Sequence, residues 1–423
     1  MKFLHERLPN GLDVIAEVTD TALSTSIGFF VKTGARDETD AEWGGSHFLE
    51  HMVFKGTHDL SADEINRRFD WMGASANAFT SEEDTAYHAA VLPEQQLEVT
   101  ALLARMMRPA LREEDFETEK LVILEEIRMY DDQPPFGADD RCRATFFGRH
   151  PLARSVLGTV ESIERMPVEA MRDYHRRRYS PGNIVLCATG AVDFKALVAS
   201  ARQWCGDWEP IAIPPRRAPL DAQTTGSATL ESITRPTSTL EYAVRMSRGP
   251  AGDDDDRFAA KLLAAILGDT SGSRLYWAMV DTGRAEQASC HHQDFLDAGL
   301  FATQLSCDPE DAGDLLAMID AIYRQAAEQG LDRREVEQNR NKLAGRWVLL
   351  GERPRRRLFD VGPEWAHSGN YRSVADDLRT IEGLSLDDVH RVLARWPLHG
   401  TGATVLAGPL PLDPSLEPAS EAQ

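Results

Sequence analysis

Apolar and polar residues along the chain follow patterns that predict both strands and helices. Apolar side chains alternate with other residues in 24–32, which predicts a strand, and residues 7–18 predict two strands that turn at Asn10-Gly11. Helices are expected at 61–71, 94–105, 112–130, 258–267, 314–329 and 332–350. The first of these begins at Ser61, which forms a capping box with Glu64. Strands and helices are therefore expected to be mixed along the whole chain.

The chain of 423 residues is too long for one ordinary core, so more than one domain is expected. Residues 209–226 contain four prolines and predict a linker between a domain of residues 1–208 and a domain of residues 227–408. The second half weakly repeats the order of the first, with a strand, an acidic loop and an apolar helix, which suggests duplication. Residues 409–423 are rich in proline and polar residues and are expected to be a disordered tail.

The most informative stretch is 44–57, in which His47, Glu50 and His51 form an H-x-x-E-H pattern, the inverzincin signature. Residues four apart on a helix are separated by about 400° of rotation, so both imidazoles leave the same face. That spacing suits two ligands of one zinc ion, and Glu50 lies close enough to reach a water molecule at the metal. Apolar neighbours indicate that this helix is buried, which argues against two surface histidines flanking a glutamate by chance.

A third zinc ligand is expected from the helix predicted at 112–130. Glu119 and Glu126 are seven residues apart, nearly two turns, so they share a face. A carboxylate completes the His₂Glu set of hydrolytic zinc enzymes, and we predict that Glu126 is this ligand. Glu119 is predicted to support the site or to position the water. The alternative is a solvated helix face, which the apolar run 121–124 disfavours because it indicates a buried helix centre.

Residues 73–80 are mostly small, so another backbone could approach them closely. One interpretation is an exposed strand edge on which an extended peptide pairs by β-augmentation. The other is a tightly packed hairpin with no such role. The residues alone leave both open.

Composition narrows the classes of partner. Formal net charge is −22, from 46 basic and 68 acidic residues, which disfavours nucleic acid and anionic membranes as partners. The acidic balance fits either a preference for basic peptides or a solvated surface. No apolar run is long enough to span a membrane, and charges interrupt the N-terminal apolar run at once, so neither a membrane segment nor a secretory signal is expected. Five scattered cysteines predict a reduced, cytoplasmic protein.

Several short motifs together resemble the pitrilysin-type inverzincin family of zinc peptidases, which includes insulin-degrading enzyme and the mitochondrial processing peptidase. The motifs are Leu8-Pro9-Asn10-Gly11-Leu12, Gly45 to Thr57, Asn77-Ala78-x-Thr80, Glu119 to Asp131, His150-Pro151 with Gly158, and Tyr179-x-Pro181-x-Asn183.

The resemblance implies an α+β fold of two homologous mixed-sheet α/β domains that close like a clamshell around a chamber. It also implies one zinc ion per chain bound by His47, His51 and Glu126, with Glu50 activating the water and Glu119 supporting the site. Asn77 and Ala78 are then expected on a substrate-binding edge strand. A homodimer, or a heterodimer with a related subunit, is the implied assembly.

One departure from the family pattern affects the functional prediction. Active members carry an arginine and a tyrosine seven residues apart in the second domain, after a Ser-Arg-Leu segment. Here Val280 and Gln287 fill these positions, and a shift by one residue gives Met279 and Glu286. Loss of a charge-stabilising group typically lowers the rate by about 10²–10³-fold.

Two functions follow as predictions. The first is a zinc endopeptidase that hydrolyses peptides or small unfolded proteins, with Glu50 as general base. The second is a zinc-bearing subunit of a heteromeric processing protease, or a weakly active assembly subunit, that needs a partner to supply the arginine and the tyrosine. A metal-binding module without chemistry would explain the histidines but not Glu50.

Overall fold

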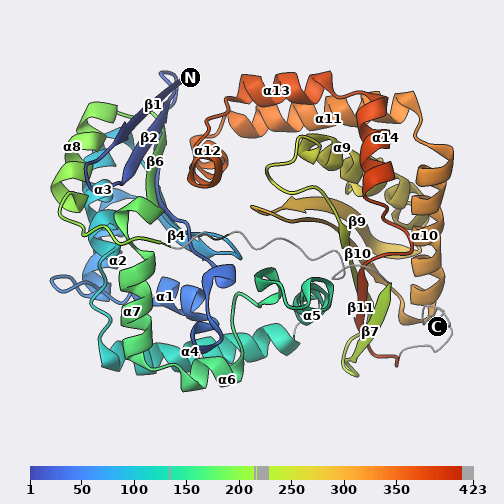
Figure 1. Ribbon diagram of the computed structural model, residues 1–423, viewed down its shortest axis with the longest axis horizontal. Coiled ribbons are helices and arrows are strands. Elements are labelled where there is room, and N and C mark those ends of the chain that lie inside the picture. The colour runs from blue at the N-terminus through green and yellow to red at the C-terminus, as the bar shows by residue number, and fades with distance from the viewer. Residues whose placement is uncertain (133–134, 214–215, 217–227, 412–423) are drawn as a thin grey trace. The chain divides into compact units, whose positions relative to one another are not determined.

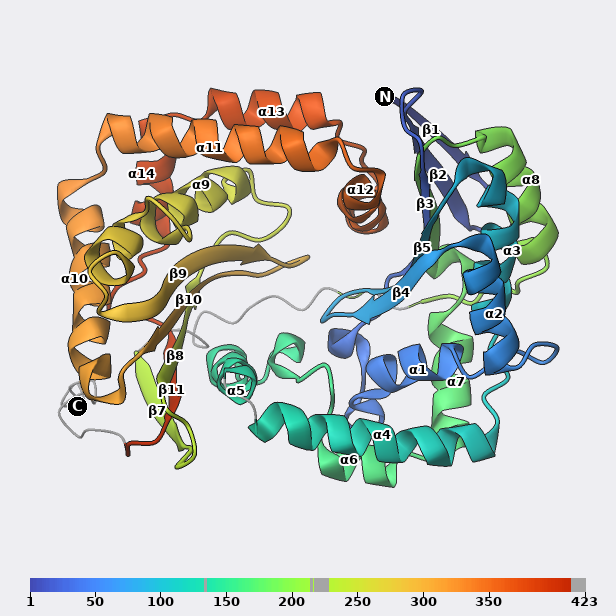
Figure 2. The same cartoon turned by 180° about the vertical axis from the view of Figure 1, so that it is seen from behind.

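The computed structural model describes residues 1–132, 135–213, 216 and 228–411, which form two compact units (Figures 1 and 2). Unit 1 comprises Met1–Ile127, Arg154–Arg216 and Val348–Ala375, and unit 2 comprises Arg128–Ala153, Arg217–Trp347 and Asp376–Gln423. These units differ from the contiguous ranges 1–208 and 227–408, because a segment of each half belongs to the unit built mainly from the other half. Most of the expected linker, and the expected tail from residue 412 onward, lie outside the described residues.

Unit 1 is built on a six-stranded mixed sheet with the strand order β1-β2-β6-β3-β5-β4. Only β2 and β6 are parallel neighbours. The expected strand at 24–32 is confirmed. The strand pair that turns at Asn10-Gly11 is also present, but its first strand, Lys2–Arg7, lies before most of the expected range 7–18. The strands are β1 (Lys2–Arg7), β2 (Asp13–Val18), β3 (Thr25–Val31), β4 (Ser75–Thr80), β5 (Thr85–Val91) and β6 (Ile184–Gly190).

Most helices of unit 1 cover one face of this sheet, because alternate strand residues such as Phe29, Tyr87 and Leu186 point into one core shared with them. The capping box of α2 is present as expected, with the Ser61 hydroxyl accepting a hydrogen bond from the backbone N–H of Glu64. The helices are α1 (Gly45–Val53), α2 (Ala62–Met72), α3 (Gln96–Met106), α4 (Glu113–Asp132), α6 (Val160–Arg165), α7 (Val168–Arg178) and α8 (Phe194–Cys205).

The opposite face of the same sheet is covered by α12 (Pro354–Ser368), which comes from the second half of the sequence. Leu358 and Val361 of this helix pack on Phe30 and Val185 of the sheet. A buried ion pair joins the two: Nε and Nη2 of Arg357 donate to the carboxylate of Glu17 on β2, at 2.9 and 2.7 Å. The first sheet is therefore completed by a distant part of the chain.

Unit 2 is built on a five-stranded sheet with the order β7-β11-β8-β10-β9. Its strands are β7 (Thr229–Thr234), β8 (Glu241–Arg248), β9 (Ala285–Asp294), β10 (Gly299–Cys307) and β11 (Ala403–Gly408). One face packs on α9 (Arg257–Gly268), α10 (Ala312–Gln329), α11 (Arg333–Gly351), α13 (Val374–Gly383) and α14 (Leu386–Arg395). The other face is covered by α5 (Phe136–Phe147), which comes from the first half.

The two sheets repeat one topology, which supports the predicted duplication. In both, two parallel strands (β2 with β6, β7 with β11) are followed by three antiparallel neighbours, and β1 is an addition in unit 1. The α+β fold of two mixed-sheet domains is confirmed. Within the described residues, no helix combines the length and the apolar character needed to cross a membrane.

Candidate metal centre

The helix that carries His47, Glu50 and His51 begins without a capping side chain of its own, because its N-cap residue is Gly44. Instead the carboxylate of Glu38 accepts hydrogen bonds from the backbone N–H groups of Gly44 and Ser46, at 2.8 and 2.7 Å. The helix dipole also favours the charged form of Glu38 at this end, against burial, which raises the pKa of this carboxyl group to about 8. The loop before α1 thus fixes where the helix starts.

Two glycines allow the chain to pass close to this start. Gly44 has φ +87°, a backbone conformation that favours glycine, and an added Cβ would lie 2.7 Å from the carbonyl oxygen of Leu157. Gly158 has φ +79°, and its added Cβ would lie 2.8 Å from Cα of Gly44. The two backbones touch, which gives a physical reason for the glycine that follows His150-Pro151 in the sequence.

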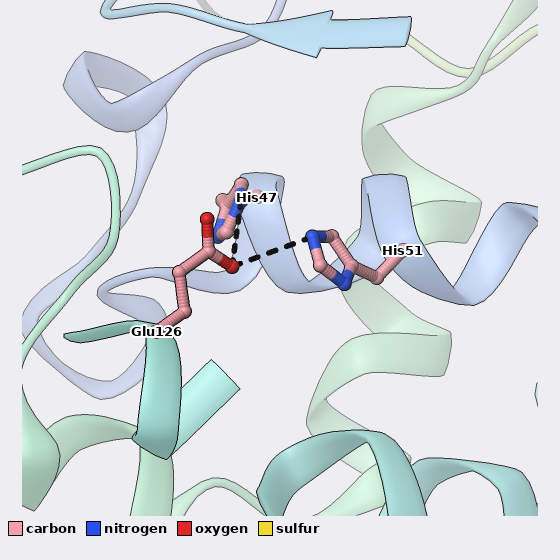
Figure 3. Close-up of side chains that lie close together, drawn as sticks. All are labelled: His47, His51 and Glu126. Atoms are coloured by element: carbon pink, nitrogen blue, oxygen red, sulfur yellow. Dashed lines mark ion pairs between the residues drawn. The ribbon is translucent and has the colours of Figure 1, made fainter. Parts of the chain in front are cut away.

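His47, His51 and Glu126 lie together, as Figure 3 shows. Oε2 of Glu126 is 3.8 Å from Nε2 of His47 and 3.6 Å from Nε2 of His51, and one ligand atom from each of the three residues lies within 4.8 Å of the others. Zinc bonds of about 2.0–2.2 Å in a tetrahedral site place ligand atoms about 3.4 Å apart. The three side chains therefore fit a zinc ion with only small movements.

The protonation of His47 also suits a metal ligand. Burial, together with the charge of His51, lowers the pKa of His47 to about 3, so its imidazole is neutral. Its other ring nitrogen, Nδ1, is buried and has no hydrogen-bond partner among the described residues. Neutral imidazole is the form that binds zinc.

Glu119 orients the second histidine from the side opposite to Glu126. Its Oε1 lies 2.8 Å from Nδ1 of His51, and its other oxygen pairs with the ammonium group of Lys55. A carboxylate on Nδ1 makes that nitrogen the donor and leaves Nε2, the nitrogen nearest Glu126, with a free lone pair. Burial acts to lower the pKa of His51, but the hydrogen bond to Glu119 and the nearby carboxylates raise it overall.

Glu50 is held from β4. The hydroxyl of Thr80 donates to Oε2 of Glu50 at 2.6 Å. The other carboxylate oxygen, Oε1, takes no part in this hydrogen bond. Burial raises the pKa of Glu50, although the Thr80 hydrogen bond and the charge of His51 act in the opposite direction. A carboxylate with a raised pKa is a stronger base at neutral pH.

Asn77 and Ala78 lie on β4, which pairs with β5 and is the last strand of its sheet. Among the described strands none pairs with the other side of β4, so its peptide groups form an edge. Asn77 is exposed, and Ala78, Phe79 and Thr80 are partly buried. β4 is therefore one strand of the β4–β5 hairpin and also the edge strand of its sheet.

The expectation that the centre of the 112–130 helix is buried was half wrong. Ile123 and Leu124 are buried in the core, but Leu121 and Val122 are 65% and 47% exposed. Four consecutive residues cover more than a full turn, so they cannot all point inward from a helix packed on one side. Glu119 is only 4% exposed. Glu126 lies close to His47 and Glu119 to His51, so both glutamates still face α1.

Three further residues of the centre were not identified from the sequence. Lys55 is four residues after His51 and lies just past the end of α1; helical spacing would place it on the face of His51, which was a usable signal. Thr80 and Glu38 act across elements, and no local spacing reveals them. The second half contributes no group of metal-binding side chains within its described residues.

Comparison with known proteins adds an independent observation. Residues 7–160 match the family model described as insulinase (peptidase family M16), and residues 165–343 match the model described as the peptidase M16 inactive domain. An uncharacterized zinc protease of Mycobacterium tuberculosis is 32% identical over 406 residues, covering 94% of this chain and 92% of the relative. The mitochondrial-processing peptidase subunit beta of Saccharomyces cerevisiae is 25% identical over 400 residues, covering 90% and 86%.

A solved structure shares the fold over nearly the full length. The crystal structure of a protease from Helicobacter pylori superimposes with a TM-score of 0.90 at 22% identity, covering 96% of this chain and 99% of that one. The match to a model described as inactive falls on a part of the chain whose described residues contain no candidate group of metal-binding side chains.

Proposed function

The chain belongs to the insulinase family of peptidases, family M16, and on that basis we propose that this metallopeptidase is a zinc-dependent endopeptidase acting on peptides or small unfolded proteins. The observation that carries the proposal is that one ligand atom each of His47, His51 and Glu126 lie within 4.8 Å of one another. Glu50 lies on α1, the helix that carries both histidines. We propose that these three residues hold one zinc ion per chain. The five free, buried cysteines suit a reduced, cytoplasmic protein.

A zinc ion in this set supplies Lewis acidity toward a peptide carbonyl and lowers the pKa of water. Glu50 takes the proton of the attacking water and returns it to the leaving amine. Thr80 fixes one oxygen of Glu50, so the other remains for the proton. Glu119 holds the ring of His51 in the orientation that presents Nε2.

The substrate is proposed to bind as an added strand on β4. Asn77 and Ala78 lie in the middle of this strand, on whose free side an extended peptide can pair. The N–H of Ala78 donates to Oδ1 of Asn77 at 2.9 Å, so the Asn77 side chain has to release this N–H before a peptide carbonyl can accept from it. Thr80, at the end of the same strand, contacts Glu50. A peptide paired with β4 would therefore lie next to the proposed base.

The test separates metal binding from proton transfer. The purified parent is expected to hold about one zinc per chain and to cleave a quenched fluorescent peptide. Glu50→Gln should keep the zinc and lose cleavage, because an amide cannot take the proton. A Glu50→Gln variant that cleaves as fast as the parent would exclude this mechanism.

A second candidate function is a subunit that needs a partner. It is favoured by Val280, at the end of the π-helical turn Tyr276–Val280, and by Gln287 on β9, which stand where active relatives are expected to carry arginine and tyrosine. Val280 cannot supply the positive charge of an arginine, and neither can Met279 in the register shifted by one residue, which pairs it with Glu286. Cleavage that appears only after a related subunit is added would favour this function over an active homodimer.

A further inference from the structure

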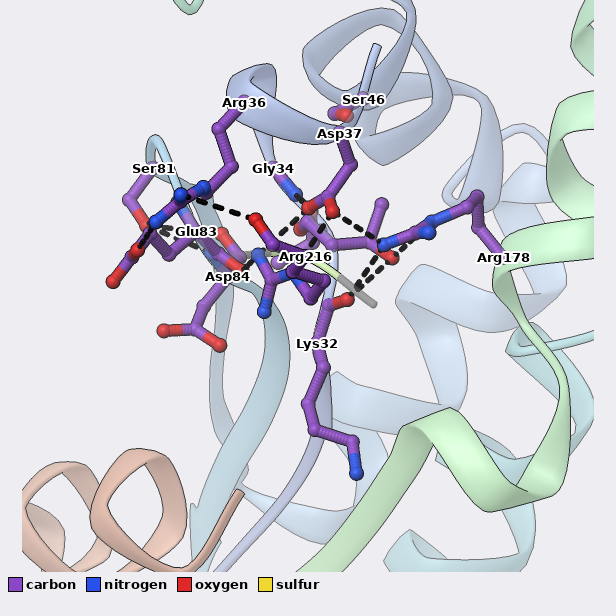
Figure 4. Close-up of polar contacts among 12 residues, drawn as sticks. Lys32, Gly34, Arg36, Asp37, Ser46, Ser81, Glu83, Asp84, Arg178 and Arg216 are labelled. Atoms are coloured by element: carbon purple, nitrogen blue, oxygen red, sulfur yellow. Dashed lines mark hydrogen bonds and ion pairs between the residues drawn. The ribbon is translucent and has the colours of Figure 1, made fainter. Parts of the chain in front are cut away.

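A buried cluster of charged side chains lies beside the loop that leads into α1 (Figure 4). At its centre the carboxylate of Asp37, 4% exposed, binds two arginines from different parts of the chain. Arg178, at the end of α7, reaches Oδ1 at 2.8 Å. Arg216 binds both oxygens, with Nε at 2.8 Å from Oδ1 and Nη2 at 2.7 Å from Oδ2. Such a two-point contact is stronger and more directional than a single one.

Arg216 also binds the turn that joins β4 to β5. Its Nη2 donates to the backbone carbonyl of Glu83 at 2.6 Å. Its own backbone carbonyl accepts from Nη2 of Arg36 at 3.1 Å, and Arg36 is paired with the carboxylate of Glu83. One guanidinium group therefore joins the loop before α1 to the β4–β5 turn.

Arg178 binds the same carboxylate but not the turn. Its remaining hydrogen bonds go to the hydroxyl of Thr33 and the carbonyl of Lys32, at 2.9 and 3.0 Å. The two arginines thus share Asp37 and differ in what else they hold. This difference separates the bridging role of Arg216 from the general effect of neutralising a buried carboxylate.

The two segments joined by Arg216 are the ones that position the proposed base. Asp37 is followed by Glu38, which binds the N-terminal N–H groups of α1, the helix of Glu50. The turn of Glu83 follows Thr80, which donates to Glu50. Backbone hydrogen bonds already connect the segments, from the N–H of Ala35 to Ser81 and of Arg36 to Glu82. Arg216 adds a connection from a third segment of the chain, since it belongs neither to the loop before α1 nor to the β4–β5 turn.

We propose that Arg216 is a positioning residue for the reaction, which fixes the β4–β5 hairpin relative to α1 and thereby aligns Thr80 and the substrate edge with Glu50. This inference rests on the proposed function. Arg216 lies where the chain leaves unit 1, and Ile211 just before it is bonded through its N–H to the hydroxyl of Ser180 at 2.8 Å. Arg216 thus connects this end of unit 1 to the loop before α1 and to the β4–β5 turn.

The experiment compares Arg216→Gln with Arg178→Gln in the full-length, zinc-loaded protein. Each variant removes one of the two arginines on Asp37 and leaves the other. Three quantities are measured: zinc content, kcat and KM for a quenched peptide, and hydrogen exchange of residues 34–37 and 81–85. Arg216→Lys is included because lysine keeps the charge but cannot make the two-point contact.

Arg216→Gln is expected to keep one zinc, to speed exchange in 81–85, and to lower kcat/KM by about 10- to 100-fold, since small misplacements near reacting groups have effects of that order. Arg216→Lys should fall between this variant and the parent. Arg178→Gln should leave exchange in 81–85 and kcat/KM within about threefold of the parent values.

Equal effects of the two glutamine variants on exchange and kcat/KM would overturn the proposal, because the cluster would then act only through overall stability. Unchanged exchange and kinetics in Arg216→Gln would also overturn it. A parent protein without peptidase activity would refute the proposed function instead. In that case the exchange comparison alone still decides whether Arg216 holds the hairpin.

Discussion

At the scale of single residues, Glu119 contacts both a proposed zinc ligand and a cation, without being a proposed ligand itself. It binds Nδ1 of His51 through one oxygen and pairs with Lys55 through the other. Burial acts to raise the pKa of Glu119, but the hydrogen bonds to His51 and Lys55 lower it overall, so this carboxylate is charged at neutral pH.

Glu119→Gln is expected to weaken zinc binding by about 10- to 100-fold, because the histidine loses the charge that keeps Nε2 basic. Competition with a chromogenic chelator measures this affinity. Glu125→Gln is the matched control, since Glu125 is an exposed neighbour on the same helix and should leave the affinity unchanged. Equal affinity of the parent and Glu119→Gln would show that Glu119 does not support the site.

Thr80 is expected to act on kcat through its single hydrogen bond to Glu50. Thr80→Val keeps the shape but removes the hydroxyl, so we expect kcat to fall by about tenfold, which is less than the 10²–10⁴ that a positioned base contributes in full. Thr80→Ser keeps the hydroxyl and should retain most of the activity. Steady-state kinetics at fixed zinc content test both, and a serine variant as impaired as the valine variant would contradict a role of the hydroxyl.

The sequence predicted some of these residues and missed others for a geometric reason. His47 and His51 are separated by one turn, and Glu119 and Glu126 by two, so helical periodicity alone placed each pair on one face. Thr80 meets Glu50 across thirty residues and two elements, and only the packing of β4 on α1 brings them together. Periodicity describes one element, and contacts between elements depend on the fold.

At the scale of elements, α1 depends on its N-cap residue, Gly44. Gly44→Ala places a Cβ 2.7 Å from a backbone oxygen in a conformation with φ +87°. We expect the free energy of unfolding to fall by more than about 1 kcal/mol, the approximate cost of this backbone conformation alone. Zinc affinity should fall with it, because the start of α1 sets the position of His47. Urea unfolding and zinc titration measure the two effects.

Gly345 provides the control for this prediction. It lies exposed in α11, and an added Cβ there meets nothing within 4 Å. Gly345→Ala is therefore expected to raise the free energy of unfolding by about 0.5–1 kcal/mol, since alanine is the better helix former. If Gly44→Ala were as well tolerated as Gly345→Ala, the close approach of Gly44 and Gly158 would not constrain the site.

Element types were predictable from the sequence, but partners of elements were not. The strand at 24–32 and the capping box at Ser61 were correctly predicted from alternation and from local hydrogen-bond chemistry. That Leu121 and Val122 are exposed could not be predicted, because the run 121–124 is apolar all round and the side that packs is chosen by the neighbouring helices. Local pattern fixes the element, and tertiary packing selects its buried side.

At the scale of the whole molecule, α12 links the second half of the chain to the first sheet through an ion pair that depends on pH. Nε2 of His367 lies 2.7 Å from Oδ2 of Asp84, just before β5. Burial acts to lower the pKa of His367, but the charge of Asp84 and the hydrogen bond to it raise the pKa overall. The folded protein thus holds this proton more tightly than the unfolded chain.

The stabilisation from this pair is therefore complete below about pH 6.5, the unfolded pKa of histidine, and is lost as pH rises through the higher folded value. We expect the difference in unfolding free energy between the parent and His367→Gln to shrink from pH 5.5 to pH 9. Urea unfolding at several pH values measures it, and taking the difference cancels the titration of the histidines in the metal centre. A difference that grows with pH would contradict the assignment.

The exchange of α5 and α12 between the two halves has a consequence for any attempt to separate them. Without α12, the sheet face formed by Ile15, Phe30 and Val185 has no cover, and each such side chain loses about 1.5–3 kcal/mol of burial. A fragment of residues 1–213 is therefore expected to bind the dye ANS and to aggregate. A peptide of residues 348–375 should restore a cooperative unfolding transition, whereas the same peptide with Leu358→Asp and Val361→Asp should not. A fragment that unfolds cooperatively alone, with the stability of the parent, would show that α12 is dispensable and that the sequence halves are independent domains after all.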